Sequence, residues 1–328
     1  MTAQTMLLGI DGGGSGTKWA TFGPDGQPLR QGRLEALTGH LFTDEDRAAA
    51  QVLLTRLVEV VQADSPRPGA VVAGISGLQQ GANVWFQDVL ADLFGLPTER
   101  VRVTDDVTLA YAAQFSPGEG VLIYAGTGSI GYFQSVGGEV CRAGGHGFLL
   151  GDEGGAFWQG QLGLKTVLQA QDQGREATGP LAEELRASVG GLDWPRVRQW
   201  VYGGGRAALA TLAPAVYRAA LAGDPDAQDV TRRAGEALAE LADTLLGRSP
   251  PGRPDVGDVG LPITLAGGAA NSLVRASFTA ALARLRPGAV QVAPRPPVLG
   301  APRLSPLQRL PAQLPSPAVQ ASEEEQPA

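Results

Sequence analysis

Short apolar runs alternate with segments of helical periodicity along the first third of the chain. Residues 69–76 (GAVVAGIS) form a continuous apolar run typical of a buried strand, and residues 83–94 carry the pattern of an amphipathic helix. A second strand is predicted at 101–104 (VRVT) and ends at two aspartates, where we expect the next helix to begin. This order of strand and helix predicts an α/β fold in which helices pack on a sheet.

The segment 43–64 is predicted to be a helix. Thr43 is a suitable N-cap and acidic residues fill the first turn. The apolar face is predicted to contain Leu53, Leu57, Val60 and Val61. Later in the chain we expect a strand at 121–125, a mostly helical stretch from about Gly155 to Arg248, and a strand, a glycine turn and a helix within 262–272. Residues 310–328 have the composition of a disordered tail.

Two segments share one layout. Residues 7–27 and 122–139 each contain an apolar strand, a loop of glycine with serine or threonine, an alternating strand and a glycine-containing turn. The repeat favours a duplicated architecture in which each half presents one such loop, and chance similarity of two glycine-rich hairpins is the alternative.

The first loop, GIDGGGSGTK at 9–18, has the composition of a phosphate-binding loop, because glycine lets backbone N–H groups approach an anion closely. It lacks the P-loop pattern, since Thr17 precedes Lys18, and it lacks the dinucleotide spacing, since Gly12 and Gly14 are followed by Thr17. The turn signature at 24–26 predicts that a strand follows, so the loop is the tip of a hairpin. An ordinary hairpin turn is the alternative to phosphate binding.

Composition narrows the function classes. The chain has 328 residues, 43% hydrophobic and 18% charged, which suits about two globular domains. A net charge of -7 without a basic stripe argues against a nucleic-acid partner. Cys141 is the sole cysteine, and the apolar run at 6–10 is too short for a signal peptide or a membrane span. We therefore expect a cytoplasmic protein with no membrane partner.

Five motifs in order resemble the N-acetylglucosamine kinase and BadF-type ATPase family of the sugar kinase/heat-shock ATPase/actin superfamily. The motifs are GIDGGGSGTK (9–18), TDD (104–106), AGTGS (125–129), GGHGFLLGDEGGAFW (144–158) and LAGGAAN (265–271). The resemblance implies a two-lobed α/β actin-like ATPase (ribonuclease H-like) fold with an interlobe nucleotide cleft. We expect lobes at 1–117 and 118–309, with a short helix near Gly300 returning to the first lobe. Homodimers are common in this family, although no segment of the sequence predicts one.

The resemblance also implies ATP and Mg²⁺. Asp11 is expected to help hold the metal, which prefers one or two carboxylates together with phosphate oxygens and water. The nucleotide is expected to contact Gly13, Gly14, Ser15, Gly16 and Thr17 of the first loop, Gly126, Thr127, Gly128 and Ser129 of the second, and Gly267, Gly268 and Asn271 of the last motif. Turns between regular elements are the alternative explanation for the later glycines.

In the matching family motif the second residue of the pair at 105–106 is the catalytic base, so this role falls to Asp106. Phosphoryl transfer to a hydroxyl needs a carboxylate that orients the acceptor and takes its proton. The family has asparagine where this chain has Asp105, which alters acceptor contacts or metal affinity. Helix capping is the alternative role for Asp105.

The sugar acceptor is expected to contact the loops around both histidines. The candidate residues are His40, Ser76, Gly77, Asp105, Gly145, His146, Gly147, Asp152 and Glu153. Family members usually have tryptophan where His146 stands and asparagine close to His40, so we hypothesise an altered acceptor specificity. Surface histidines without a role, and helix-capping roles for Asp152 and Glu153, are the alternatives.

These features favour ATP-dependent phosphorylation of a hexosamine or N-acetylhexosamine hydroxyl. An ATPase activator of a CoA-ester dehydratase or reductase is an alternative from the same family. Such activators hold a [4Fe–4S] cluster with two cysteines from each subunit, whereas this chain has Cys141 alone. A non-catalytic sugar-sensing protein is the other alternative, and the presence of both Asp11 and Asp106 argues for catalysis.

Overall fold

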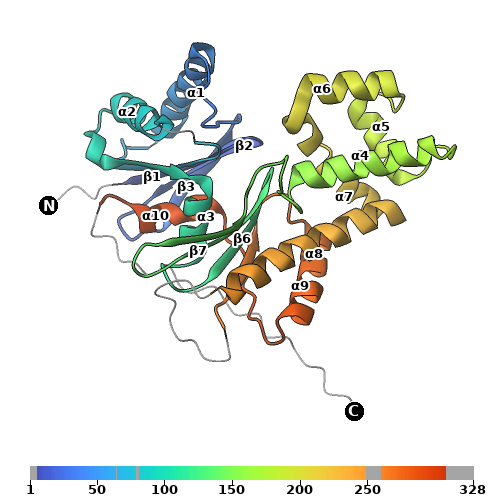
Figure 1. The fold of residues 1–328 in the computed structure, drawn as a ribbon. Helices are drawn as coiled ribbons and strands as arrows, with labels where there is room; N and C mark the ends of the chain where they lie inside the picture. Colours follow the sequence, from blue (N-terminus) through green and yellow to red (C-terminus); the bar gives the residue numbers. More distant parts are fainter. Residues whose placement is uncertain (1–5, 64, 79–80, 249–259, 308–328) are drawn as a thin grey trace. The chain divides into compact units, whose positions relative to one another are not determined.

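The computed structural model describes residues 6–63, 65–78, 81–248 and 260–307, which belong to two compact units (Figure 1). The first unit takes the chain as far as Ser116 and again from Pro294, and the second runs from Pro117 to Ala293. The sequence alone placed this boundary at 117/118. The predicted tail at 310–328 and the last residue of the helix predicted at 43–64 lie outside the described residues.

Each unit is built on one sheet. The first sheet has the order β3-β2-β1-β4-β5 and the second β8-β7-β6-β9. Their bounds are β1 Leu7–Gly13, β2 Gly16–Phe22, β3 Pro28–Leu34, β4 Ala70–Ile75, β5 Val101–Asp105, β6 Val121–Ala125, β7 Ser129–Gln134, β8 Val140–Gly144 and β9 Ile263–Ala266.

The two sheets share a pairing scheme. β1 pairs with β2 antiparallel and with β4 parallel, and β6 pairs with β7 antiparallel and with β9 parallel. Both glycine-rich loops are therefore tips of β-hairpins, as the sequence predicts. The repeat seen in the sequence corresponds to a repeated strand arrangement, which favours duplication over chance similarity.

Helices cover both faces of the first sheet. α1 (Asp44–Gln62) and α2 (Ala82–Phe94) contribute to one buried cluster, which includes Leu8, Ile10 and Phe86. α3 (Asp106–Gln114) and the short α10 (Ala301–Leu304) contribute to another, which includes Leu7 and Leu109. Consecutive residues of β1 thus face opposite clusters, as strand geometry requires. The chain returns from Pro294 to place α10, preceded by a 3₁₀ turn at Pro297–Gly300, in this unit.

The predicted cap of α1 is confirmed. The Thr43 hydroxyl accepts a hydrogen bond from the Asp46 amide, and the Asp46 carboxylate accepts one from the Thr43 amide at 2.9 Å. The predicted apolar face is shifted, because Leu53 and Val60 are only half-buried. The buried positions are Ala50, Leu54, Leu57 and Val61. The pattern was ambiguous because consecutive apolar residues at 52–54 and 60–61 allow two neighbouring faces of the helix.

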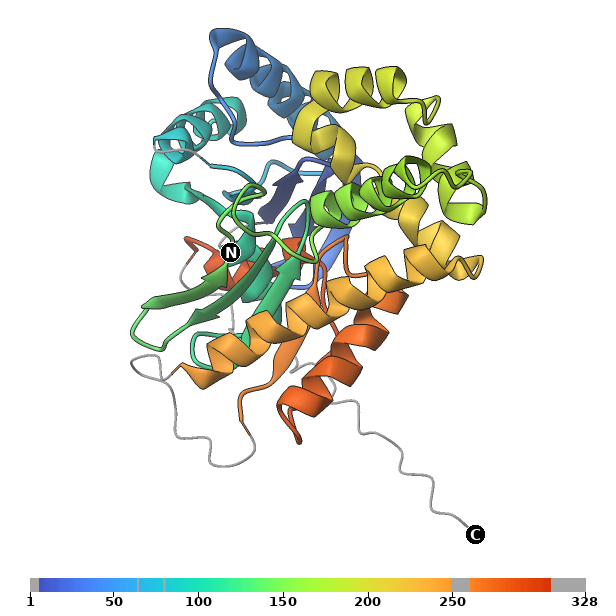
Figure 2. The ribbon, with the colours of Figure 1, turned by 45° about the vertical axis from the view of Figure 1, so that its right-hand side comes forward.

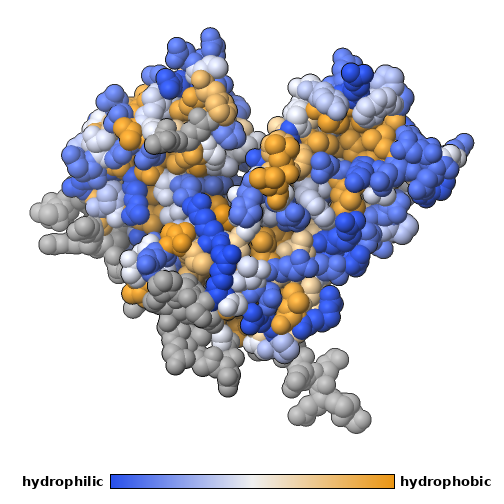
Figure 3. Space-filling model, in the orientation of Figure 1, coloured by the Kyte–Doolittle hydropathy of each residue, from blue (hydrophilic) through white to orange (hydrophobic). Residues whose placement is uncertain are grey.

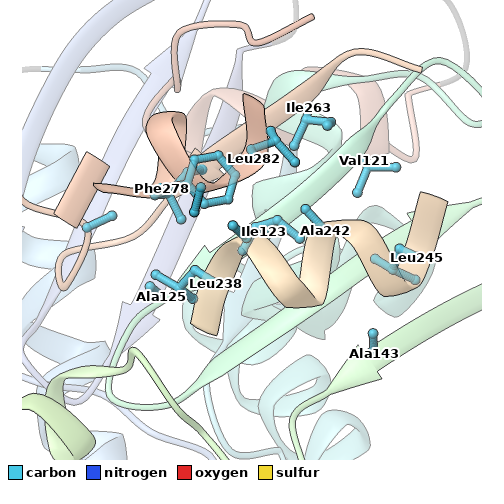
Figure 4. Packing of buried hydrophobic residues seen from close by; sticks show 14 of the residues in the cluster. Val121, Ile123, Ala125, Ala143, Leu238, Ala242, Leu245, Ile263, Phe278 and Leu282 are labelled. Carbon is cyan, nitrogen blue, oxygen red and sulfur yellow. The ribbon is translucent and has the colours of Figure 1, made fainter. Parts of the chain in front are cut away.

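In the second unit α8 and α9 pack beside one another on the sheet (Figures 1 and 2). Leu238, Ala242 and Leu245 of α8 and Phe278 and Leu282 of α9 meet the sheet in a continuous apolar core, shown in Figure 4. The predicted helical stretch is confirmed as a series of helices. The bounds of these helices are α4 Ala156–Asp172, α5 Pro180–Val189, α6 Trp194–Ala210, α7 Ala213–Leu221 and α8 Pro225–Gly247. The helix α9 follows later in the chain, at Ser272–Leu285.

Apolar and hydrophilic residues are interspersed on the face drawn in Figure 3. The exposed large apolar residues include three in succession, Phe148, Leu149 and Leu150, in the loop between β8 and α4.

Among the described helices, none combines the length and the apolar character needed to span a bilayer.

Candidate functional site

The hairpin β1–β2 presents its glycines at an open tip. Gly14 and Ser15 are exposed, whereas Asp11 in the adjoining strand is buried. Asp11 lies opposite Lys18 in the pairing register, and the Lys18 Nζ is 3.7 Å from the Asp11 carboxylate. Burial raises the pKa of Asp11 above its ordinary value of 3.8, and the Lys18 ammonium opposes this shift. The hairpin therefore holds a desolvated carboxylate that a cation would stabilise.

Other side chains hold the same hairpin in place. The Thr17 hydroxyl is buried and donates to the Glu35 carbonyl at 2.7 Å. Arg33 donates to the Ser15 carbonyl at 2.6 Å, so its guanidinium lies beside the glycine loop. Thr17, predicted to contact phosphate, thus has a structural hydrogen bond through its hydroxyl. Arg33, which the sequence did not single out, places a positive charge at the loop.

The aspartate pair stands at the carboxyl end of β5, beside the parallel strand β4. Asp105 is the N-cap of α3 and accepts from the Thr108 amide at 2.8 Å and from the Thr108 hydroxyl at 2.9 Å. Asp106 is the first residue of α3. The structure therefore gives Asp105 the capping role that the sequence left open, and a role in acceptor contact remains a prediction.

Asp106 has a strongly perturbed carboxyl group. Burial, followed by the negative charges of Asp105 and Asp11, raises its pKa from 3.8 to about 6, while a hydrogen bond with the Ser76 side chain opposes the shift. Because Asp11 lies close enough to influence Asp106, the first unit brings the predicted metal ligand and the predicted base together. A carboxylate with this pKa is largely ionised at neutral pH and is suited to accept a proton.

His40 lies against the same group of residues. Gly39 donates to the Ser76 carbonyl at 2.8 Å, which fixes the loop beside the end of β4. Gly77 has a φ of 73°, and a Cβ atom there would lie 2.3 Å from the His40 Nε2. Glycine is thus required by both conformation and close approach. The structure brings His40 beside Gly77, next to Ser76, whose side chain hydrogen-bonds Asp106. A role of these residues in acceptor binding remains a prediction.

The second hairpin is supported by the segment that follows β8. Backbone amides of Ala156 and Phe157 donate to the carbonyls of Gly126 and Thr127 at 2.9 and 3.0 Å. The Ser129 hydroxyl donates to the Glu153 carbonyl at 2.6 Å. The loop at 126–128 is therefore held directly over the start of α4, and the two motifs that the sequence separated form one structure.

Close backbone approach explains the glycines of these two motifs. A Cβ at Gly155 would lie 2.6 Å from the Gly128 carbonyl carbon, and a Cβ at Gly128 would lie 2.2 Å from an oxygen of Asp152. Neither position can hold a side chain without displacing its neighbours. Asp152 itself has a φ of 67°, which is uncommon for a residue other than glycine.

Asp152 is buried and pairs with a residue that sequence reasoning missed. Arg206 Nη2 is 3.0 Å from the Asp152 Oδ2. Arg206 follows Gly205, whose φ of 57° and ψ of -143° interrupt α6. The ion pair joins positions 54 residues apart. No local sequence pattern predicts this ion pair, although the run of three glycines at 203–205 predicts a break in the helix.

The loop that carries His146 is exposed. Gly145 and Gly147 have positive φ values of 69° and 86°, and His146 lies exposed between them. A Cβ at Gly151 would lie 3.7 Å from the His146 Cβ, so the loop folds back toward the segment that contains Asp152 and Glu153. These predicted acceptor residues are thus neighbours within the second unit.

The last motif connects β9 to α9. The Ala269 amide donates to the Ala125 carbonyl at 2.9 Å, which brings the turn at Gly267 and Gly268 beside the start of the second hairpin. The Asn271 side chain accepts from the amides of Leu273 and Val274 and is the N-cap of α9. A contact between Asn271 and a nucleotide remains a prediction, because capping accounts for its side-chain oxygen.

The model of the BadF/BadG/BcrA/BcrD ATPase family matches residues 8–301. The chain belongs to this family. The matched range starts in β1 and ends at the first residue of α10, so it includes both glycine-rich hairpins and the aspartate pair. The resemblance seen in the sequence is confirmed.

Two curated relatives of the chain are kinases. It is 28% identical over 179 residues to the N-acetylmuramic acid/N-acetylglucosamine kinase of Clostridium acetobutylicum, covering 52% of this chain and 56% of that protein. It is 25% identical over 262 residues to the N-acetyl-D-glucosamine kinase of Dictyostelium discoideum, covering 74% of this chain and 80% of that protein. The first alignment therefore spans little more than half of the relative.

Solved structures confirm the fold of this family member. A protein of Chromobacterium violaceum, provisionally assigned as an N-acetylglucosamine kinase, has a TM-score of 0.70 and 26% identity, covering 90% of this chain and 97% of that one. The ROK family glucokinase of Streptomyces griseus, solved with glucose and AMPPNP, has a TM-score of 0.60 and 16% identity, covering 92% and 99%. The two-sheet α/β architecture is thus that of sugar kinases of the actin-like ATPase superfamily.

Proposed function

We propose that this protein transfers the terminal phosphoryl group of ATP to a hydroxyl group of a hexosamine or N-acetylhexosamine. Membership of an ATPase family and similarity to two curated amino-sugar kinases support this reaction. The observation that carries the proposal is the Asp106 carboxyl, whose raised pKa of about 6 suits a group that accepts a proton from a sugar hydroxyl.

Asp106 acts as the base in this proposal. Its carboxylate takes the hydroxyl proton while the hydroxyl oxygen forms a bond to the terminal phosphorus. The bond from that phosphorus to the bridging oxygen breaks, and ADP leaves with the electron pair. The Ser76 side chain, which hydrogen-bonds Asp106, orients the carboxylate toward the acceptor.

The donor set of the first unit fits Mg²⁺. The described residues contain no group of three or more His, Cys, Asp or Glu side chains arranged to hold a metal ion. A single buried carboxylate such as Asp11 matches an ion that keeps several waters and takes its other ligands from phosphate. Bound Mg²⁺ would neutralise phosphate charge, and Lys18, 3.7 Å from Asp11, adds a further positive charge.

We assign contacts with the ATP phosphates to each of the two glycine-rich hairpins, of which each unit contains one. The exposed tip at Gly14 and Ser15 supports this for the first hairpin. In the second, the rigid connection of Gly126 and Thr127 to α4 supports it, because a preorganised loop binds phosphate without an ordering cost. Sugar contacts are assigned to the loop of His40 in the first unit and, in the second unit, to the loop of His146 and to Asp152.

The test is an ADP-release assay with glucosamine, N-acetylglucosamine, N-acetylmuramic acid, N-acetylmannosamine and glucose as acceptors. We expect turnover with at least one amino sugar and loss of turnover in Asp106→Asn. Absence of turnover with all five sugars, or full activity of Asp106→Asn, would overturn the proposal. ATP hydrolysis that no sugar stimulates would instead favour an ATPase activator, although Cys141 alone cannot supply the two cysteines that a shared cluster takes from each subunit.

A further inference from the structure

The ion pair between Asp152 and Arg206 lies against the second glycine-rich hairpin. The Asp152 Oδ2 approaches Gly128 so closely that a Cβ on this glycine would lie 2.2 Å from it. The same Cβ would lie 2.9 Å from the Arg206 Nη2. Both charged groups are therefore in contact with the loop to which we assign ATP phosphates, and both belong to the second unit.

Asp152 alone would oppose phosphate binding. Its side chain is only 5% exposed, so water screens its negative charge poorly. A buried carboxylate beside a loop that binds anions repels them, because like charges at short range cost free energy in a medium of low polarity. The Arg206 guanidinium removes this repulsion by pairing with the carboxylate at 3.0 Å.

The surroundings of Arg206 indicate that it is held for this purpose. Its side chain is 34% exposed, and its Nε is buried without a hydrogen-bond partner among the described residues. A buried unpaired donor is unfavourable, and the ion pair of the same guanidinium with Asp152 offsets part of that cost. The guanidinium also lies 5.6 Å from the centre of the Phe148 ring, which makes an edge-to-face contact with the ring of Phe157 in α4. These contacts fix the cation over Gly128.

We propose that Arg206 is a positioning residue that neutralises Asp152 and so keeps the second glycine-rich loop able to bind ATP phosphates. The inference rests on the proposed assignment of phosphates to that loop. The proposal gives a role to a residue that directly follows the interruption of α6 at Gly205 and that lies far in sequence from every motif. It also explains why position 128 is glycine, since both members of the pair occupy the space of a side chain there.

The experiment measures the affinity of the full-length protein for a non-hydrolysable ATP analogue by calorimetry with Mg²⁺ present. We expect Arg206→Gln to raise the Kd about tenfold or more, from the repulsion of one unscreened carboxylate. Arg206→Lys keeps the charge and is expected to bind within about threefold of the wild type. The decisive variant combines Arg206→Gln with Asp152→Asn, and we expect it to bind nearly as well as the wild type because no carboxylate is left to neutralise.

The control is Arg218→Gln. Arg218 of α7 makes an ion pair with Glu184 of α5 in the same unit, so its loss is expected to leave ATP affinity unchanged. Thermal unfolding of each variant separates loss of folding from loss of binding. Where Arg206→Gln does not fold, Asp152→Asn decides the matter. It leaves the Arg206 cation unpaired at the loop, so we expect it to bind the ATP analogue at least as tightly as the wild type, and weaker binding would overturn the inference.

Two results would overturn the inference. Wild-type affinity in Arg206→Gln would show that the loop does not need this cation. Equal weakness of Arg206→Gln and the double variant would show that Arg206 does not act through Asp152. The proposed sugar kinase activity is tested independently of this inference. It is refuted if the wild type binds ATP but phosphorylates none of the five sugars, and the affinities of the Arg206 variants do not affect that result.

Discussion

Replacing Asp106 by asparagine tests the central assignment by stability rather than activity. The folded protein holds this carboxyl at a pKa of about 6 instead of 3.8, mainly because it is desolvated and secondarily because Asp105 and Asp11 are negative. An acid whose pKa is raised by folding binds its proton more tightly in the folded state. Stability therefore decreases as pH rises from the unfolded pKa to the folded pKa, and the full cost is present above about pH 6.

The size of the effect follows from the two pKa values. The ionised carboxyl destabilises the folded protein by about 1 kcal/mol at pH 4.5 and by about 3 kcal/mol at pH 7. Asp106→Asn is thus expected to stabilise the ligand-free protein by about 3 kcal/mol at pH 7 and by only about 1 kcal/mol at pH 4.5.

The assay is urea unfolding of the ligand-free wild type and variant at several pH values, followed by circular dichroism. The control is Asp44→Asn, a first-turn aspartate of α1 whose side chain is 96% exposed and whose replacement is expected to change stability by less than about 0.5 kcal/mol. The reasoning is refuted if Asp106→Asn is no more stable than the wild type at pH 7, or if its advantage does not grow with pH.

Three further predictions concern activity and the loops. The kcat/KM of the wild type should fall about tenfold per pH unit below about pH 6 as Asp106 becomes protonated, measured as initial rates of ADP release, and a flat profile down to pH 5 would contradict its role as base. Gly128→Ala should lower the free energy of unfolding by about 1–3 kcal/mol and weaken ATP binding, because the new Cβ would collide with Asp152. Both effects are measured by urea unfolding and calorimetry. The matched control is Gly203→Ala, whose new Cβ would meet no atom within 4 Å. His40→Ala should raise the KM for the sugar by about tenfold or more and leave the KM for ATP unchanged, and an unaltered sugar KM would remove His40 from the acceptor site.

Local signals in the sequence were sufficient for much of the fold. Buried strands were predictable from apolar runs, and the Thr43 N-cap was predictable because its hydrogen-bond partner, Asp46, is only three residues away. The hairpin form of GIDGGGSGTK followed from the turn at 24–26, and the two hairpins proved to occupy equivalent places in their sheets. The buried stripe of α1 was misjudged by one position, since burial depends on the sheet that the helix packs against.

The candidate site was only partly readable. Asp106 was identified because the pair at 105–106 matches the family motif, but its pKa depends on burial and on Asp11, which is distant in sequence. The side chains of Asp105 and Asn271 make local hydrogen bonds, and the Thr17 hydroxyl makes one to the Glu35 carbonyl. Composition could not distinguish these hydrogen bonds from ligand contacts.

The sequence by itself determined the α/β class, the two glycine-rich hairpins and the family, because each depends on residues that are near neighbours in the chain or stand in a fixed order. Tertiary structure alone decided that Gly128 must be glycine and that Asp152 pairs with Arg206. These facts depend on backbones and charges brought together from separate segments. A strand or a turn needs only its own residues, whereas the charge at a binding loop is set by whatever side chain the fold places beside it.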